Sequence, residues 1–381
     1  MRRLLAGFWA TLVLSCLSTA ALAQPPAPVH DTGNPLVEPG PQEAGVTDPG
    51  EGSHFTAGGG VFLLRAFPGN DTAFNSFAST QTNSFFTGSS STTSSVSTVT
   101  EFHHGFEVAP LVWLGYVSDS GLGGRVRWWR FAEDTSLGAF LPAASPLVGD
   151  LTRTVSLHAA PFDQLALDAS VSPLGAQQLL FANRVRLNVW DLEVTEDFPF
   201  NSWRGLFAGG VRYAMLSQDY SASRVRLLGQ DPATGTATVF DGSTLLAHHT
   251  FDGLGPTLAL EGHFPLPIPG LALYGNLRGS VLFGHNQEEA AAQAVLQHFS
   301  PLAAGTPGGS STTSVWSATP EAVLPVGEVE LGGEWSRSLG RITPFVRAGV
   351  LGQTWVDAGS SASASGSLGF FGFTLTAGAE F

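Results

Sequence analysis

The feature that most constrains the fold is a strict alternation of apolar residues with polar or small ones. In the last eleven residues, every second position is apolar: FGFTLTAGAEF (371–381). The same period of two recurs in WRGLFAGGVRYAMLS (203–217), LALYGNLRGSVLF (271–283) and RITPFVRAGVLGQTWV (341–356). A period of two with one apolar face is the pattern of a half-buried β-strand. The chain is therefore expected to be all-β.

Alternating runs of this kind follow one another from residue 54 to the C-terminus. Their length, roughly 10 to 18 residues, exceeds that of an average strand and matches a strand that crosses a membrane at a tilt. Short and long connectors alternate between them, as in an outer-membrane barrel. We therefore expect a transmembrane antiparallel up-and-down β-barrel of about 10 strands, with short periplasmic turns and long outer loops. The expected strands are 54–66, 102–117, 121–132, 177–195, 202–220, 247–264, 270–286, 319–338, 341–357 and 367–381.

Two segments depart from this scheme. Residues 150–176 are compatible with part of an outer loop or with an extra hairpin, and the hairpin would raise the count to 12 strands. Near residue 190 the alternation loses its phase, because Asp191 and Glu193 fall on the face that holds Val185 and Leu187. We expect a β-bulge there or the end of the lipid-facing band.

The polar faces of the strands are expected to line the lumen. A charge on the lipid face at mid-bilayer costs about 2–4 kcal/mol, so arginines on the strands should point inward. Acidic residues of the same phase are available as their partners. The lumen-lining candidates are Arg125, Arg127, Arg184, Arg186, Arg204, Arg212, Glu261, Arg278, Glu330, Glu334 and Arg347.

Aromatic residues near the ends of the expected strands suggest two interfacial girdles. The girdle candidates are Tyr116, Trp128, Trp203, Trp335 and Trp355. The alternating C-terminal strand that closes on an aromatic residue also fits a signal for the barrel-assembly machinery. The residues expected to carry this assembly signal are Phe373, Leu375 and Phe381.

The N-terminus is typical of an exported protein. Residues 1–23 combine two arginines, an apolar run and a small-x-small cleavage site, and predict a cleaved signal peptide. The one cysteine, Cys16, lies inside it, which leaves lipidation there as an alternative. Residues 24–53 are rich in Pro, Gly and acid and read as a disordered periplasmic leader. Residues 54–381 are then the barrel, located in the cell outer membrane.

Several function classes are disfavoured. The net charge of −14 argues against nucleic acid as a partner. No nucleophile-elbow or zinc-protease motif is present, so no enzyme activity and no cofactor are expected. The pairs His103–His104 and His248–His249 do not suggest a metal site, because neighbouring residues of a strand point to opposite faces.

The chain resembles the pore-forming major outer-membrane protein family first typified in Legionella, particularly its planctomycete members. The stretches that carry the resemblance are RVRLNVWDLEVTEDF (184–198), WRGLFAGGVRYAMLSQDY (203–220), FDGLGPTLALEGHFPL (251–266), LALYGNLRGSVLFG (271–284), GEVELGGEWSRSLGRITPFVRAGVLGQTW (327–355) and LGFFGFTLTAGAEF (368–381). The resemblance implies a porin-like β-barrel and transfers no site residue.

Two functions are consistent with these features. The first is passive passage of small solutes through a lumen lined by Arg and Glu. The alternative is a structural or adhesive barrel with a packed lumen and functional outer loops. The two differ in whether Arg204, Arg212, Arg278 and Arg347 each meet a lumen acid. The expected partners are outer-membrane lipid and lipopolysaccharide, the barrel-assembly machinery and small solutes.

Overall fold

The computed structural model describes residues 52–69, 71–84, 90–141, 151–159, 167–170, 177–200, 203–228, 239–298, 308–359 and 366–381. The expected signal peptide, and the expected leader up to residue 51, lie outside them. The strands belong to one compact unit, Glu51–Phe381. They are β1 (His54–Pro68), β2 (Thr72–Ser84), β3 (Ser90–Glu101), β4 (Glu107–Val117), β5 (Leu122–Leu141), β6 (Leu151–Ala159), β7 (Leu167–Ser170), β8 (Gln177–Phe200), β9 (Trp203–Leu228), β10 (Val239–Pro265), β11 (Leu271–His298), β12 (Gly308–Ala318), β13 (Glu321–Ser336), β14 (Thr343–Trp355) and β15 (Leu368–Glu380). No helix in this part of the chain is long and apolar enough to span a membrane.

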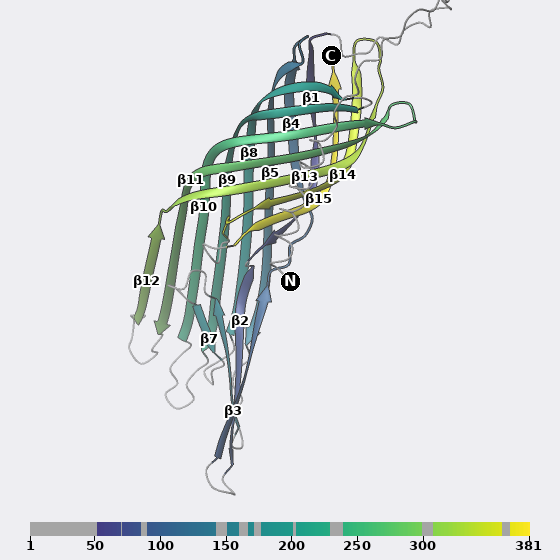
Figure 1. The fold of residues 1–381 in the computed structure, drawn as a ribbon. Coiled ribbons are helices and arrows are strands. Elements are labelled where there is room, and N and C mark those ends of the chain that lie inside the picture. The colour runs from purple at the N-terminus through teal and green to yellow at the C-terminus, as the bar shows by residue number, and fades with distance from the viewer. Residues whose placement is uncertain are drawn as a thin grey trace, which may run out of the picture. The chain divides into compact units, whose positions relative to one another are not determined.

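Ten strands close into an antiparallel barrel (Figure 1). Their order around the ring is β1, β4, β5, β8, β9, β10, β11, β13, β14, β15 and back to β1. The first and last strands form the closing seam, in a register that runs from Thr56 opposite Glu380 to Pro68 opposite Leu368. The count of ten expected from the sequence is thereby confirmed.

The 12-strand alternative is wrong. Residues 151–159 and 167–170 do form a hairpin, β6–β7, but it pairs with β2 in a separate four-stranded sheet of order β3-β2-β6-β7. That sheet shares no backbone ladder with the described strands of the ring. An additional strand, β12, pairs with the outer part of β11.

The ring has one end with short turns and one end with long connections. At the short-turn end, Gly121 and Gly340 adopt left-handed conformations with φ of 83° and 74°, which a side chain would disfavour. Phe55 and Phe381 meet at the same end through two backbone hydrogen bonds of 2.8 and 2.9 Å. Both ends of the barrel chain therefore lie at the short-turn end.

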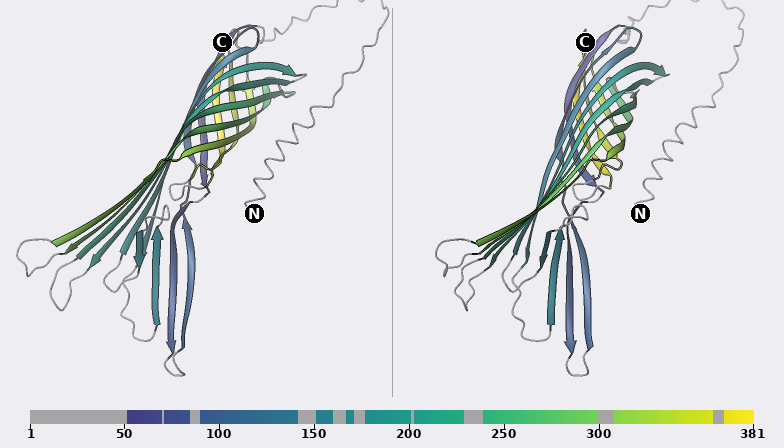
Figure 2. Two further views of the ribbon diagram at one scale, coloured as in Figure 1. Left: turned by 60° about the vertical axis from the view of Figure 1, so that its left-hand side comes forward. Right: turned by 90° about the vertical axis from the view of Figure 1, so that its left-hand side faces the viewer.

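Several strands continue well beyond the expected length. β9, β10 and β11 have 26, 27 and 28 residues, and Figure 2 shows these tilted strands running on past the ring. The connectors 133–176, 221–246 and 287–318, expected to be loops, are therefore partly strand. One face of the extended sheet is buried, because Tyr220, Ala222 and Leu245 are at most 2% exposed.

The outward face of the ring carries an apolar band. Its exposed side chains include Leu63 on β1, Val112 on β4, Leu192 on β8, Leu258 on β10 and Leu375 on β15. Aliphatic side chains that point away from a closed barrel are suited to hydrocarbon. Because every strand of the ring pairs with a neighbour on each side, the wall has no open edge, as a lipid environment requires.

Candidate functional site

The half of the lumen nearer the short-turn end holds a network of charged side chains. Asp191 on β8 is at its centre and is fully buried. Its carboxylate accepts two hydrogen bonds from Arg212 on β9, from Nε at 2.6 Å and from Nη2 at 3.0 Å. Arg278 on β11 and Arg127 on β5 place guanidinium nitrogens 3.5 and 3.8 Å from the same carboxylate. Three arginines from three strands thus share one acid.

Further acids complete the network. Glu328 on β13 accepts a 2.9 Å hydrogen bond from Arg127 and lies 3.6 Å from Arg212. Glu193 on β8 pairs with Arg278 and, at 2.9 Å, with Arg125 on β5. Arg125 also reaches Glu261 on β10, at 2.6 Å. These pairs connect strands on opposite sides of the ring, so the network cross-links the barrel through its interior.

Solvent reaches the network from the short-turn end. Side-chain exposure rises from 1% at Arg212 to 14% at Arg125 and 24% at Arg347 on β14. Arg347 donates a 2.5 Å hydrogen bond to Glu334, and His263 lies 3.4 Å from the same carboxylate. The lumen is thus wet at this end and dry toward its middle.

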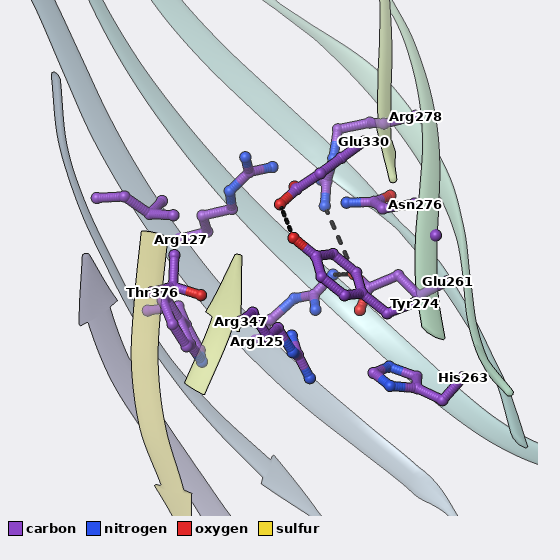
Figure 3. Close-up of a pocket in the computed structure, with 13 residues that line it drawn as sticks. Arg125, Arg127, Glu261, His263, Tyr274, Asn276, Arg278, Glu330, Arg347 and Thr376 are labelled. Atoms are coloured by element: carbon purple, nitrogen blue, oxygen red, sulfur yellow. Dashed lines mark hydrogen bonds and ion pairs between the residues drawn. The ribbon is translucent and has the colours of Figure 1, made fainter. Parts of the chain in front are cut away.

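A small cavity lies within the network. Its volume is about 60 Å³, enough for a few water molecules. Its lining includes Arg125, Arg127, Arg278, Arg347, Glu261 and Glu330, which Figure 3 shows around it. Tyr274 donates a 2.5 Å hydrogen bond to Glu330, which also accepts one of 2.8 Å from Thr374. These hydrogen bonds hold the carboxylate against the wall.

An apolar layer fills the lumen beyond the network, toward the long-connection end. All ten strands contribute to it, and its members are Phe62, Leu64, Ala66, Ala109, Leu111, Trp129, Phe131, Val185, Leu187, Val189, Ala214, Leu216, Phe251, Leu282, Leu324, Val326, Leu351, Trp355, Ala358, Leu368 and Phe370. None of these residues is more than 5% exposed. A water-filled channel would leave the side chains that line it accessible, so this level of the lumen is closed.

The base of the separate sheet covers the apolar layer. Tyr220 on β9 donates a 2.7 Å hydrogen bond to the carbonyl of Ala73, and the ring of Phe74 stacks on Phe181 at 4.8 Å. Phe102 packs edge-on against Tyr220. The start of β2 and the link after β3 therefore pack against the inner face of β8 and β9.

A buried histidine holds this base in place. Through its two ring nitrogens, His104 contacts Glu133 on β5 and Asp71 before β2, each at 2.8 Å. It lies beyond the membrane-spanning part of β5, where the outward face has become polar. Burial lowers the pKa of His104, but the hydrogen bonds and negative charges of Asp71 and Glu133 outweigh this and raise it to about 9. His104 is therefore a cation at neutral pH and pairs with two carboxylates.

Comparison with known proteins agrees with this architecture. Residues 47–376 match the profile of a family described as Legionella pneumophila major outer membrane protein precursor. The chain belongs to this family. The resemblance inferred from the sequence is thereby confirmed, and the family and the closed barrel support a location in the outer membrane.

Solved structures of outer-membrane proteins match the chain at low similarity. The outer membrane protease OmpT from Escherichia coli is 8% identical, with a TM-score of 0.34 over 86% of this chain and 96% of that one. The P. putida toluene transporter TodX is 9% identical, with a TM-score of 0.18 over 88% of this chain and 92% of that one. No curated protein sequence matches the chain. These scores are too low to inform the function of this family member.

Most of the lumen candidates lie inside the barrel. Eight of them belong to the charged network or line its cavity: Arg125, Arg127, Arg212, Glu261, Arg278, Glu330, Glu334 and Arg347. Arg204 is on the face of β9 that carries its lumen-facing residues, but it is exposed and lies at the rim of the short-turn end.

The prediction is wrong for Arg184 and Arg186, which point outward and are exposed. On β8 it is Val185 and Leu187 that face the lumen, together with Asp191. The sequence argument assumed that an apolar face always meets lipid. Here the apolar face belongs to the packed layer inside the barrel, and the outward arginines lie beyond the lipid-facing band. The expected bulge is absent, since β8 pairs with β9 in one unbroken register.

The girdle candidates divide into three groups by exposure. Tyr116 and Trp335 are exposed at the short-turn end, at 42% and 49%. Trp128 and Trp203 are half-buried. The prediction is wrong for Trp355, which is fully buried in the apolar layer. Near the long connections, an aromatic side chain can pack inside the lumen or lie at the membrane interface. The position of the residue in the sequence does not tell which of the two it does.

The residues of the expected assembly signal point outward. Phe373 and Leu375 on the last strand are 49% and 55% exposed, and Phe381 directly after it is 54% exposed. Their role in assembly stays a prediction.

Sequence reasoning missed the centre of the network. Asp191 and Glu193 were noticed only as a break in phase, and Glu328 was not singled out. The signal was present in that break, because two acids in phase with Val185 and Leu187 mark one continuous lumen face. The His104 cluster carried no comparable signal, since Asp71 and Glu133 lie 33 and 29 residues from it. No group suited to a metal ion occurs in the described part of the chain.

Proposed function

We propose that this protein is a closed structural barrel of the outer membrane that carries extended β-sheets beyond the lipid, and not an open channel. The observation that carries the proposal is the apolar layer across the lumen, to which all ten strands contribute and in which no residue is more than 5% exposed. Barrels of about eight strands have interiors filled by side chains, whereas aqueous channels are typical of 16 or more. A ten-stranded barrel with a packed interior follows the smaller class.

The charges of the lumen support the same proposal. Arg212, Arg278 and Arg347 each meet an acid at the distance of an ion pair or hydrogen bond. Arg204 is the fourth of the arginines whose pairing distinguishes the two functions, and it lies at the exposed rim of the short-turn end. An anion-selective passage would need guanidinium groups that are free to exchange partners, whereas these hold the strands together. Paired charges are the arrangement expected of a structural barrel.

Porin-like passage of small solutes remains the second candidate. The cavity lined by Arg125, Arg278 and Arg347 lies in the half of the lumen that solvent reaches from the short-turn end, and a small anionic solute would meet a favourable charge there. Passage would then require the apolar layer and the overlying base of β2 to move aside. Enzyme activity forms no part of either proposal.

Planar-bilayer recording of the purified full-length chain separates the two candidates. A closed barrel is expected to give no conductance steps, while a general porin in the same bilayer serves as positive control. Trp355→Ala combined with Trp129→Ala removes the two largest side chains of the apolar layer and is expected to produce conductance. Regular steps from the unmodified protein would overturn the proposal.

A cellular measurement tests the structural role. Deletion of the gene is expected to make cells sensitive to detergents without slowing the uptake of small hydrophilic solutes. Slower uptake with an intact permeability barrier would favour the porin-like candidate instead.

A further inference from the structure

The outward faces of β5 and β8 change character over a few residues. Directly opposite pairs on these two strands are, in order, Val126 and Leu192, Trp128 and Trp190, Arg130 and Asn188, Ala132 and Arg186, and Asp134 and Arg184. The first pair is aliphatic, the second is aromatic, and the following three bring three guanidinium groups and one carboxylate. The apolar band and a cationic cluster therefore meet at a pair of tryptophans.

The two tryptophans, Trp128 and Trp190, mark the boundary between the apolar band and the cationic cluster. The rings of Trp128 and Trp190 lie 6.0 Å apart, and Trp190 is 46% exposed. The indole N–H of Trp128 donates a 2.6 Å hydrogen bond to the side-chain oxygen of Asn188. Tryptophan with its polar edge turned away from hydrocarbon is typical of the level at which lipid head groups begin. The next residues outward on each strand are thus at head-group height.

Two cations lie at that height without an ion-pair partner among the residues that the structure describes. Arg130 and Arg186 are exposed and are diagonal neighbours on the same face of adjacent strands. Neither makes an ion pair with another described residue, whereas Arg184 is paired with Asp134.

The neighbouring strand adds one acid near this pair, Asp219, which is diagonal to Arg186. On β9, Met215 lies opposite Asn188, and Ser217 lies opposite Arg186. Asp219 lies opposite Arg184 and is hydrogen-bonded to His248. Counted with Asp134 and Asp219, the three arginines Arg130, Arg184 and Arg186 still leave an excess of positive charge in a chain whose net charge is −14.

We propose that Arg130 and Arg186 bind the phosphate group of an anionic membrane lipid whose acyl chains lie along Trp190 and Leu192. Guanidinium groups bind phosphate through paired, charge-assisted hydrogen bonds, and two of them a strand apart present their donors to one group. The two tryptophans set the depth of the phosphate in the membrane, because a phosphate bound next to them lies where the acyl chains of the lipid can enter the apolar band. A phosphorylated lipid satisfies both halves of this surface, and a free phosphate ion satisfies only one.

Native mass spectrometry of the detergent-solubilised full-length chain tests the proposal, with lipid A as the phosphorylated probe. The test variant is Arg130→Gln/Arg186→Gln. The matched control is Arg224→Gln/Arg226→Gln. It also removes two positive charges, but from positions on the face of β9 that carries its lumen-facing residues. Lipid A retention is expected to fall by roughly tenfold or more in the test variant and to be unchanged in the control.

Two further arms identify the source of the phosphate. Excess inorganic phosphate is expected not to displace lipid A, and Trp190→Ala is expected to weaken lipid A retention without unfolding the barrel. Equal retention by wild type and test variant would overturn the proposal. So would equal losses in test and control variants, or displacement by inorganic phosphate, which would indicate non-specific charge attraction or a free-anion site. Urea unfolding of each variant verifies that the barrel is intact.

Discussion

Replacing Asp191 by Asn tests whether the lumen network stabilises the barrel. The carboxylate is fully buried and is shared by Arg212, Arg278 and Arg127. In this inner cluster three arginines face three acids, the other two acids being Glu328 and Glu193. Asn keeps the volume and removes the charge, so three buried cations are left with two anions. Removing one partner from a buried ion pair costs about 3–5 kcal/mol, because the remaining charge is uncompensated.

The assay is urea unfolding of the protein in lipid vesicles, followed by tryptophan fluorescence and extrapolated linearly to zero denaturant. Asp191→Asn is expected to lower the free energy of unfolding by about 3–5 kcal/mol. Glu334→Gln is the matched control. Its pair with Arg347 is partly exposed, with side chains 13% and 24% accessible, so its loss should cost about 1 kcal/mol or less.

A second variant distinguishes charge balance from packing. Asp191→Leu combined with Arg212→Met removes both members of the central pair and is expected to restore much of the loss, since apolar replacements of buried pairs are often close to neutral. The reasoning would be refuted if Asp191→Asn changed the unfolding free energy by less than about 1 kcal/mol, or by no more than Glu334→Gln.

Three other perturbations have defined outcomes. Gly372→Val on β15 is expected to prevent closure of the seam and abolish the folded, heat-modifiable band, because a Cβ there collides with the backbone oxygen of Leu63 on β1; Gly352→Ala, which meets open space, should have no effect. The raised pKa of His104, about 9 against roughly 6.5 when unfolded, means that its stabilisation is complete below about pH 6.5 and is lost as the pH rises through 9. The protection of the backbone amides of residues 102–106 against hydrogen exchange, relative to the intrinsic rate at each pH, should therefore fall between pH 7 and 10. His104→Gln should show low protection at pH 7 and at pH 10, and the exposed neighbour change His103→Gln should leave the pH dependence of the protection intact. Phe381→Ser is expected to reduce the amount of protein in the outer-membrane fraction, and unchanged levels would exclude an assembly role for that residue.

The ring of strands was accessible from the sequence because it depends on local pattern. A period of two assigns Phe371, Phe373 and Leu375 to one face whatever surrounds them, and the structure places all three outward. Short polar connectors allow only antiparallel neighbours, so the ten strands follow in order around the barrel. The alternation gave wrong predictions at Arg184 and Trp355, where the position of the side chain also depends on what the face of the strand contacts.

Those failures have one cause. Alternation tells which residues share a face, but not which medium that face meets. On β8, Val185 and Leu187 alternate as lipid-facing residues would, yet they pack inside the lumen, while Arg186 points outward beyond the band. The choice is decided by the other nine strands, whose apolar residues fill the same level of the interior.

By itself the sequence determined the all-β class, the family and the ten strands, because these rest on contacts between residues that are near in the chain or follow a fixed period. Only the tertiary structure decided that apolar side chains from all ten strands pack across the lumen and that arginines and acids of the lumen are paired. Arg127 and Glu328 are separated by 201 residues, and Arg278 and Glu193 by 85. Such partners meet only once the barrel has closed, since the tilt and stagger of all ten strands set which side chains face one another across its interior.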